Sequence, residues 1–162
     1  MSEPESKVSD ELGAAEEPTP PLWDLVETQA CLARLWTMAK EWHGIRVRYN
    51  DVLAVAAWVP PERPWGTAEI LLPRNPLPHP VDAPDLESNA LGDLARLAHE
   101  FGRHLRYRED PTRHLPTNDL GEEERAWEYG RQVLRAIGFS SWPGFDELRD
   151  EHLRGLRRHH PA

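Results

Sequence analysis

Cysteine is almost absent from this 162-residue chain, in which Cys31 is the only one. A single cysteine excludes an intramolecular disulfide and any metal site built from several cysteines, and it fits a reducing compartment. Long apolar runs are also missing, since no stretch approaches the roughly 18 consecutive apolar residues of a membrane span. The N-terminus is acidic where a secretory signal would be positive. We therefore expect a cytoplasmic protein that does not enter a membrane.

Basic residues are scarce near the N-terminus. Residues 1–21 hold six acidic side chains and one lysine, so they contribute −5 of the formal net charge of −9. This segment is rich in Glu, Pro and Ser and poor in large apolar groups, and we expect a disordered acidic tail. The acidic balance repels a phosphate backbone and no basic helix can be read from the sequence, so nucleic acid is not an expected partner.

The remaining residues suffice for one domain of the α+β class. Apolar residues make up 39% of the chain and seven are tryptophans, which allows a single core in residues 22–158. We expect residues 159–162 to be a flexible tail. His152, His159 and His160 stand among C-terminal arginines, and we interpret them as part of a frayed basic end.

Apolar periodicity predicts four helices and a small three-stranded sheet, antiparallel or mixed. The helices are expected at residues 22–42, around 94–105, at 121–137 and at 145–157, and the strands at 45–49, 53–59 and 67–72. The first two strands should pair as a hairpin through Asn50 and Asp51, with the second strand buried. A proline-rich connection over 73–84 and a polar loop over 106–118 complete the expected order.

The second helix contains the sequence HEFGRH, from His99 to His104. It begins like HExxH, in which two histidines four residues apart lie about 40° from each other around the helix and bind one Zn²⁺. Here the position of the second histidine is occupied by Arg103, which has no lone pair to give a metal. His104 lies about 140° from His99 around an ideal helix, so it reaches the same metal only if the helix is distorted.

The third helix contains the sequence EERAWEYG, in which Glu123 shares a face with Ala126, Trp127 and Gly130. The small residues on this face permit a close approach to another helix. Glu123 is therefore the acidic residue best placed to meet His99.

Together, HEFGRH and the following ExxA resemble the ImmA/IrrE family of zincin-like metallopeptidases. The resemblance implies helices packed on a small sheet, with the HExxH-type helix and the ExxA helix forming the site. It implies His99 and Glu123 as zinc ligands and Glu100 as the general base that activates water. It also implies that the strand at 67–72 is an edge strand lining a substrate cleft. Arg103 departs from the family pattern at a ligand position.

Three functions remain open from the sequence. In the preferred one, the metal site is degenerate and the domain binds a peptide or protein, with Arg103 projecting into the vacated metal pocket to pair Glu100 with Glu123. In the second, the domain is an active zinc endopeptidase whose third ligand is His104 or His114. In the third, it is a structural domain without a site.

Overall fold

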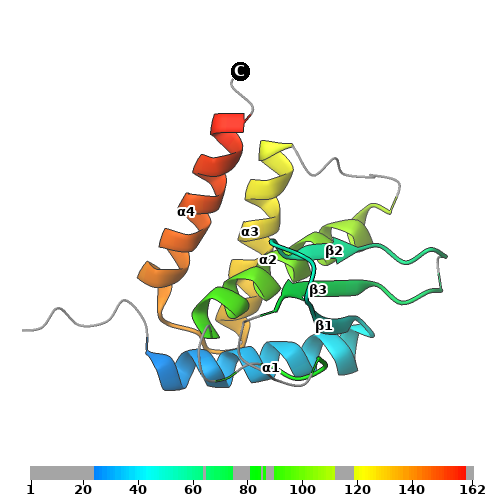
Figure 1. Cartoon of the computed structure of the whole chain (residues 1–162), viewed down its shortest axis with the longest axis horizontal. Helices are drawn as coiled ribbons and strands as arrows, with labels where there is room; N and C mark the ends of the chain where they lie inside the picture. The colour runs from blue at the N-terminus through cyan, green and yellow to red at the C-terminus, as the bar shows by residue number, and fades with distance from the viewer. Residues whose placement is uncertain are drawn as a thin grey trace, which may run out of the picture.

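The computed structural model describes residues 24–63, 65–74, 81–84, 86, 90–111 and 119–159. These residues form four helices and a small three-stranded sheet, which confirms the α+β class (Figure 1). In chain order the elements are α1 (Leu25–His43), β1 (Arg46–Asn50), β2 (Ala57–Val59), β3 (Glu69–Pro73), α2 (Ala90–Glu109), α3 (Leu120–Ala136) and α4 (Trp142–His159). None of these helices has the length and apolar character that crossing a membrane requires.

Several expected segments fall outside the described residues or have different ends. The acidic tail at 1–21, the segment 112–118 with His114, and residues 160–162 lie outside them. The polar loop expected from residue 106 begins later, because α2 continues to Glu109. Arg106 stabilises this last turn, since its guanidinium lies 3.0 Å from Glu122 of α3 and 3.1 Å from Glu109. The C-terminal helix likewise extends through His159, so the expected frayed basic end is helical to that residue.

Helix α1 has well-defined ends. The Asp24 carboxylate accepts a 2.8 Å hydrogen bond from the Glu27 N–H, which satisfies one free donor of the first turn. Gly44 ends the helix at φ 61°, a left-handed conformation that suits glycine, and its N–H donates to the Ala39 carbonyl. Cys31 lies on the buried stripe of this helix, so its thiol is part of the core.

The sheet is mixed, with the order β1-β3-β2. β1 runs parallel to β3 and β2 runs antiparallel to it, so the hairpin expected between the first two strands is wrong. The side chain of Asn50 accepts hydrogen bonds from the N–H groups of Val52 and Leu53, and this turn directs the chain out of the sheet after β1. The strand expected at the edge is the central β3, and β2 is an edge strand instead.

The second strand is shorter and less buried than its apolar sequence indicated. Only Ala57–Val59 pairs in the sheet, and its residues are half-buried or exposed. The preceding residues 53–56 leave the ladder, and Val55 is 70% exposed. Apolar character alone therefore misled the prediction here, because these residues leave the ladder and expose their side chains.

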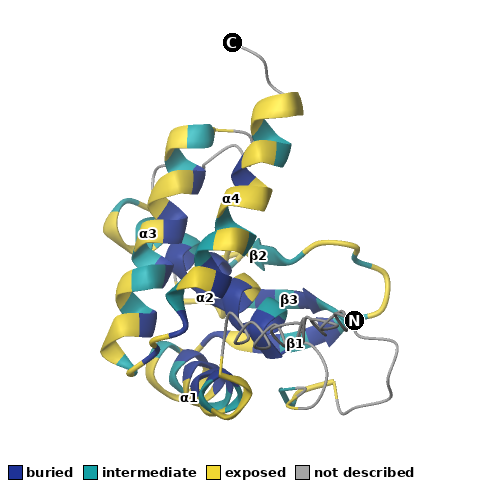
Figure 2. Ribbon diagram, turned by 90° about the vertical axis from the view of Figure 1, so that its left-hand side faces the viewer, coloured by how far each residue is buried: buried dark blue, intermediate teal, exposed yellow. Residues whose placement is uncertain are grey.

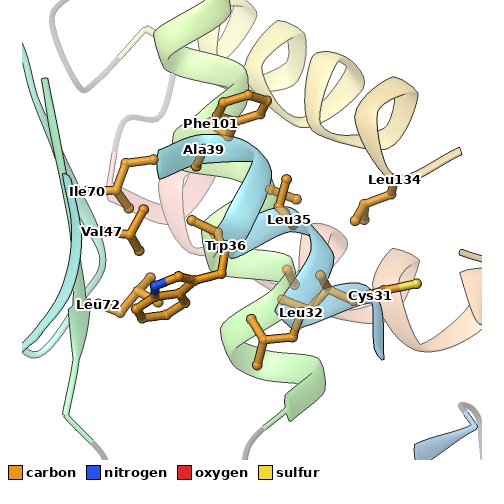
Figure 3. Packing of buried hydrophobic residues seen from close by; sticks show 14 of the residues in the cluster. Cys31, Leu32, Leu35, Trp36, Ala39, Val47, Ile70, Leu72, Phe101 and Leu134 are labelled. Carbon is orange, nitrogen blue, oxygen red and sulfur yellow. The ribbon is translucent and has the colours of Figure 1, made fainter. Parts of the chain in front are cut away.

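The core lies between the sheet, α1 and α2 (Figures 2 and 3). Val47 of β1 and Ile70 and Leu72 of β3 point from the sheet toward α1, where Trp36 meets them (Figure 3). Trp36 also contacts Tyr49, with 5.4 Å between the ring centroids. Burial of each large apolar side chain contributes roughly 1.5–3 kcal/mol, so this layer fixes α1 and α2 relative to the sheet.

Candidate functional site

Helices α2 and α3 cross with their backbones almost in contact. A Cβ atom on Gly102 would overlap the carbonyl oxygen of Ala126, and one on Gly130 would lie 2.6 Å from the carbonyl oxygen of Ala98. Only glycine permits this approach at either position. The small-residue face predicted for α3 thus brings Glu123 against the turn of α2 that begins with His99.

Three side chains from three helices converge beside this crossing. His99 of α2 and Glu123 of α3 are buried, and His152 of α4 is partly exposed. Glu123 Oε2 lies 2.8 Å from His99 Nε2 and 3.2 Å from His152 Nε2. One potential ligand atom of each residue lies within 4.8 Å of the other two. Two imidazole nitrogens and a carboxylate oxygen are a donor set that Zn²⁺ accepts.

Arg103 approaches the other side of the same carboxylate. Its guanidinium forms an ion pair with Glu123 Oε1, and its Nε lies 3.5 Å from Glu100 Oε2 without a hydrogen bond. Arg103 therefore lies against both glutamates. It occupies only one oxygen of Glu123, so Oε2 remains facing the two histidines.

The surroundings favour a charged carboxylate on Glu123. Burial raises its pKa, but hydrogen bonding to His152 and His99 and the positive charges of His99 and Arg103 outweigh burial and hold the pKa far below its usual range. For His99, burial lowers the pKa, whereas its contacts with Glu100 and Glu123 raise it, and the net direction is upward. Glu123 is thus an anion at neutral pH that attracts positive charge.

His99 itself is held from both sides. Its ring stacks on Trp127 with centroids 4.5 Å apart and an interplanar angle of 17°. Its Nδ1 lies 3.2 Å from Glu100 Oε1. Its Nε2 is buried and lies 2.8 Å from Glu123 Oε2. Both ring nitrogens of His99 therefore face carboxylates, Nδ1 that of Glu100 and Nε2 that of Glu123.

A cleft of about 290 Å³ opens over this cluster. Its charged and polar lining comes from Arg96, His99, Glu100, Glu151 and His152, and its apolar lining includes Trp127 and Leu148. Residues 54–56, which lead into the edge strand β2, line it as well. The site is therefore open to a ligand that lies beside β2.

His104 is not brought to this cluster. Its ring stacks with Phe101 at an interplanar angle of 18° and a centroid distance of 6.3 Å, and it also neighbours His43 and Trp58. Burial, with the nearby charges of His43 and Arg108, lowers its pKa to about 4. This separation agrees with the angle that five residues span on a helix. His114, the other proposed third ligand, lies outside the described residues.

His152 is the residue that sequence analysis missed, because it was assigned to a basic end. A usable signal was present in its spacing. It follows Phe145 by seven residues and Leu148 by four, which places all three on one stripe of a helix. Since Phe145 is buried against Trp127, that stripe faces the site.

Comparison of the chain with known proteins gave no relatives: no protein-family model, curated protein or solved structure matches it. The resemblance to ImmA/IrrE peptidases therefore depends on the two sequence motifs and stays a prediction.

Proposed function

We propose that this chain is a zincin-like domain that binds an extended peptide or protein segment in the cleft beside β2. The proposal rests on one observation, that a cleft whose polar lining includes His99, Glu100 and His152 lies next to an edge strand. The arrangement of an HExxH-type helix, an ExxA helix and a small sheet supports the assignment of this domain to the zincin-like class. The departure at Arg103 favours binding over catalysis.

The outer edge of β2 is suited to receive another strand. Within the described sheet β2 pairs only with β3, so its other side offers backbone groups to a ligand. Large apolar side chains are exposed on and around this strand: Val52, Val55, Val59 and Trp65. A ligand that adds a strand here gains backbone hydrogen bonds and covers apolar surface in the same step.

The polar lining of the cleft supplies groups that recognise a main chain. Glu100 lines the cleft, and a carboxylate there is an acceptor for a peptide N–H. His152 is partly exposed on the cleft wall and can contact a carbonyl or carboxylate. These contacts would fix the register of a ligand lying along β2.

Selection of binders from a random peptide library displayed on phage tests this proposal. Selected peptides are then titrated against the full chain by fluorescence polarisation. Ala54→Trp, which fills the cleft mouth, should weaken binding by at least about tenfold, or roughly 1.4 kcal/mol. Ala136→Trp on the exposed end of α3 is the matched control and should bind normally. Binders that tolerate Ala54→Trp, or a selection that yields none, would favour the structural domain without a site.

A zinc-dependent endopeptidase is the second candidate. It is favoured by the position of Glu100, which lines the cleft directly beside His99, where a general base would act on metal-bound water. A pooled fluorogenic peptide library, assayed with and without added Zn²⁺, tests it. Cleavage that depends on metal and is lost in Glu100→Gln would establish the enzyme, and uncleaved but bound peptides would support the binding module.

A further inference from the structure

We infer that His99, Glu123 and His152 form a binding site for one divalent metal ion of the zinc class, with His152 supplying the ligand that Arg103 cannot. This inference goes beyond peptide binding, which needs no metal. The three residues come from α2, α3 and α4, and each offers a ligand atom within 4.8 Å of the others. The third ligand has therefore moved from the motif helix to the C-terminal helix.

Two of the three donor–donor distances are close to those around a tetrahedral ion, and the third is within 4.8 Å. Ligands about 2.0–2.1 Å from a tetrahedral Zn²⁺ lie about 3.3 Å from each other. Glu123 Oε2 lies 2.8 Å from His99 Nε2 and 3.2 Å from His152 Nε2, close to that value. The fourth position would face the cleft, since His99 and His152 both line it.

An independent observation is the orientation of the buried His99 ring. Its Nε2 points at Glu123 Oε2, 2.8 Å away, so a buried nitrogen and a buried carboxylate oxygen face each other at the proposed metal position. Its other nitrogen, Nδ1, lies 3.2 Å from the carboxylate of Glu100. Histidine ligands of zinc commonly hold their second ring nitrogen against a carboxylate in this way. In this arrangement Glu100 is a positioning residue for His99.

The charges around the site leave room for a cation. Glu100 and Glu123 carry two negative charges and Arg103 carries one positive charge, so the three groups sum to −1 when the histidines are neutral. Arg103 pairs with Glu123 Oε1 and leaves Oε2 to the histidines. Glu123 would therefore bind the ion through one oxygen while Arg103 holds the other.

Cobalt binding to the full chain, freed of metal by a chelator, tests the inference. Co²⁺ is added stepwise, its visible absorption is followed, and Zn²⁺ is then added to displace it. We expect one ion per chain with the intense bands of tetrahedral cobalt. His152→Ala should lower the affinity by more than about 100-fold, whereas His159→Ala, at the exposed end of the same helix, should leave it unchanged.

A second variant shows whether residue 152 touches the ion even if His152→Ala loses affinity for another reason. His152→Cys should give a near-ultraviolet thiolate-to-cobalt band that is absent from the wild type, whose own Cys31 is buried in the core. Circular dichroism of the metal-free proteins verifies that each variant is folded. Equal affinities of wild type and His152→Ala, or no cobalt band in the wild type, would overturn the inference. Because no peptide is present, the outcome is independent of the proposed peptide binding.

Discussion

Arg103 of α2 and Glu123 of α3 form an ion pair across the close α2–α3 crossing, at the position where an HExxH helix would present its second histidine. The side chain of Glu123 is 5% exposed and that of Arg103 is 18% exposed, so the pair is largely shielded from water. Removal of one partner from a shielded pair strongly lowers the stability of the fold, because the remaining buried charge is left without compensation. Arg103 therefore neutralises a carboxylate that the fold buries.

Replacing Arg103 with alanine should destabilise the metal-free protein by roughly 2–4 kcal/mol, because it leaves Glu123 buried beside fewer positive charges. Urea unfolding at pH 7 with a chelator present measures the loss. Arg125→Ala is the matched control, since its side chain is 58% exposed and pairs with Glu122 near the surface. That control should lose less than about 0.5 kcal/mol. Equal losses in the two variants would contradict a buried ionic role for Arg103.

Replacing Arg103 with histidine restores HExxH and should change which residues hold the metal. The new imidazole lies about 40° from His99 around the helix and removes a positive charge from the site. We expect Arg103→His to bind cobalt at least about tenfold more tightly than the wild type. The double variant Arg103→His, His152→Ala should still bind, unlike His152→Ala alone. If the double variant fails to bind, the α2 helix is not presenting its motif as a zincin helix does.

Local sequence predicted the elements of the site better than their arrangement. The spacing of Glu123, Ala126 and Gly130 indicated a close helix approach, and the structure places Glu123 2.8 Å from His99. Glu123, Ala126 and Gly130 lie within two turns of one helix, and over that distance helical periodicity shows which side chains share a face. The contact of Arg103 with Glu100 and Glu123 could be predicted from the sequence for the same reason.

Arrangements set by distant segments could not be predicted in this way. The parallel pairing of β1 with β3 depends on the turn after Asn50 and on Val81, whose carbonyl accepts the Tyr49 N–H at 2.9 Å on the flank of β1. His152 joins the site from α4, which packs against α3 through Phe145 and Trp127 among other contacts. Neither the β1–β3 pairing nor the docking of α4 is marked by a short sequence motif. The helical spacing of His152 from Phe145 and Leu148 could nevertheless have indicated that His152 lies on the same face of its helix as Phe145.

Two glycine-to-alanine variants should have opposite effects, because Gly102 lies in the α2–α3 crossing whereas Gly155 on α4 has open space around it. In a helix interior alanine is favoured over glycine by about 1 kcal/mol, and Gly155→Ala on α4 should stabilise by up to that amount because no atom lies within 4 Å of its Cβ. In Gly102→Ala the new Cβ overlaps the Ala126 carbonyl, and we expect a loss of at least about 1–3 kcal/mol. Thermal and urea unfolding measure both variants.

The same Gly102→Ala variant also tests whether the crossing positions the metal ligands. Separation of α2 from α3 should move His99 away from Glu123 and lower cobalt affinity, whereas Gly155→Ala should retain it. A Gly102→Ala protein as stable as Gly155→Ala would show that the helices are further apart in solution than the structure has them.

The buried His104 should make stability fall in mild acid. Its pKa is lowered to about 4 in the fold, against 6.5 when exposed. Between these two pH values His104 is protonated in the unfolded chain but not in the folded chain. The stabilisation is complete above pH 6.5, is lost progressively as pH falls toward 4, and amounts to at most about 3.4 kcal/mol. His104→Leu keeps an apolar contact with Phe101 and removes this titration. Urea unfolding from pH 7.5 to 4.5 should therefore show a flatter decline for His104→Leu than for wild type. His159→Leu, which removes an exposed histidine, should follow the wild-type curve, and parallel curves for all three proteins would show that His104 is accessible to protons in the folded state.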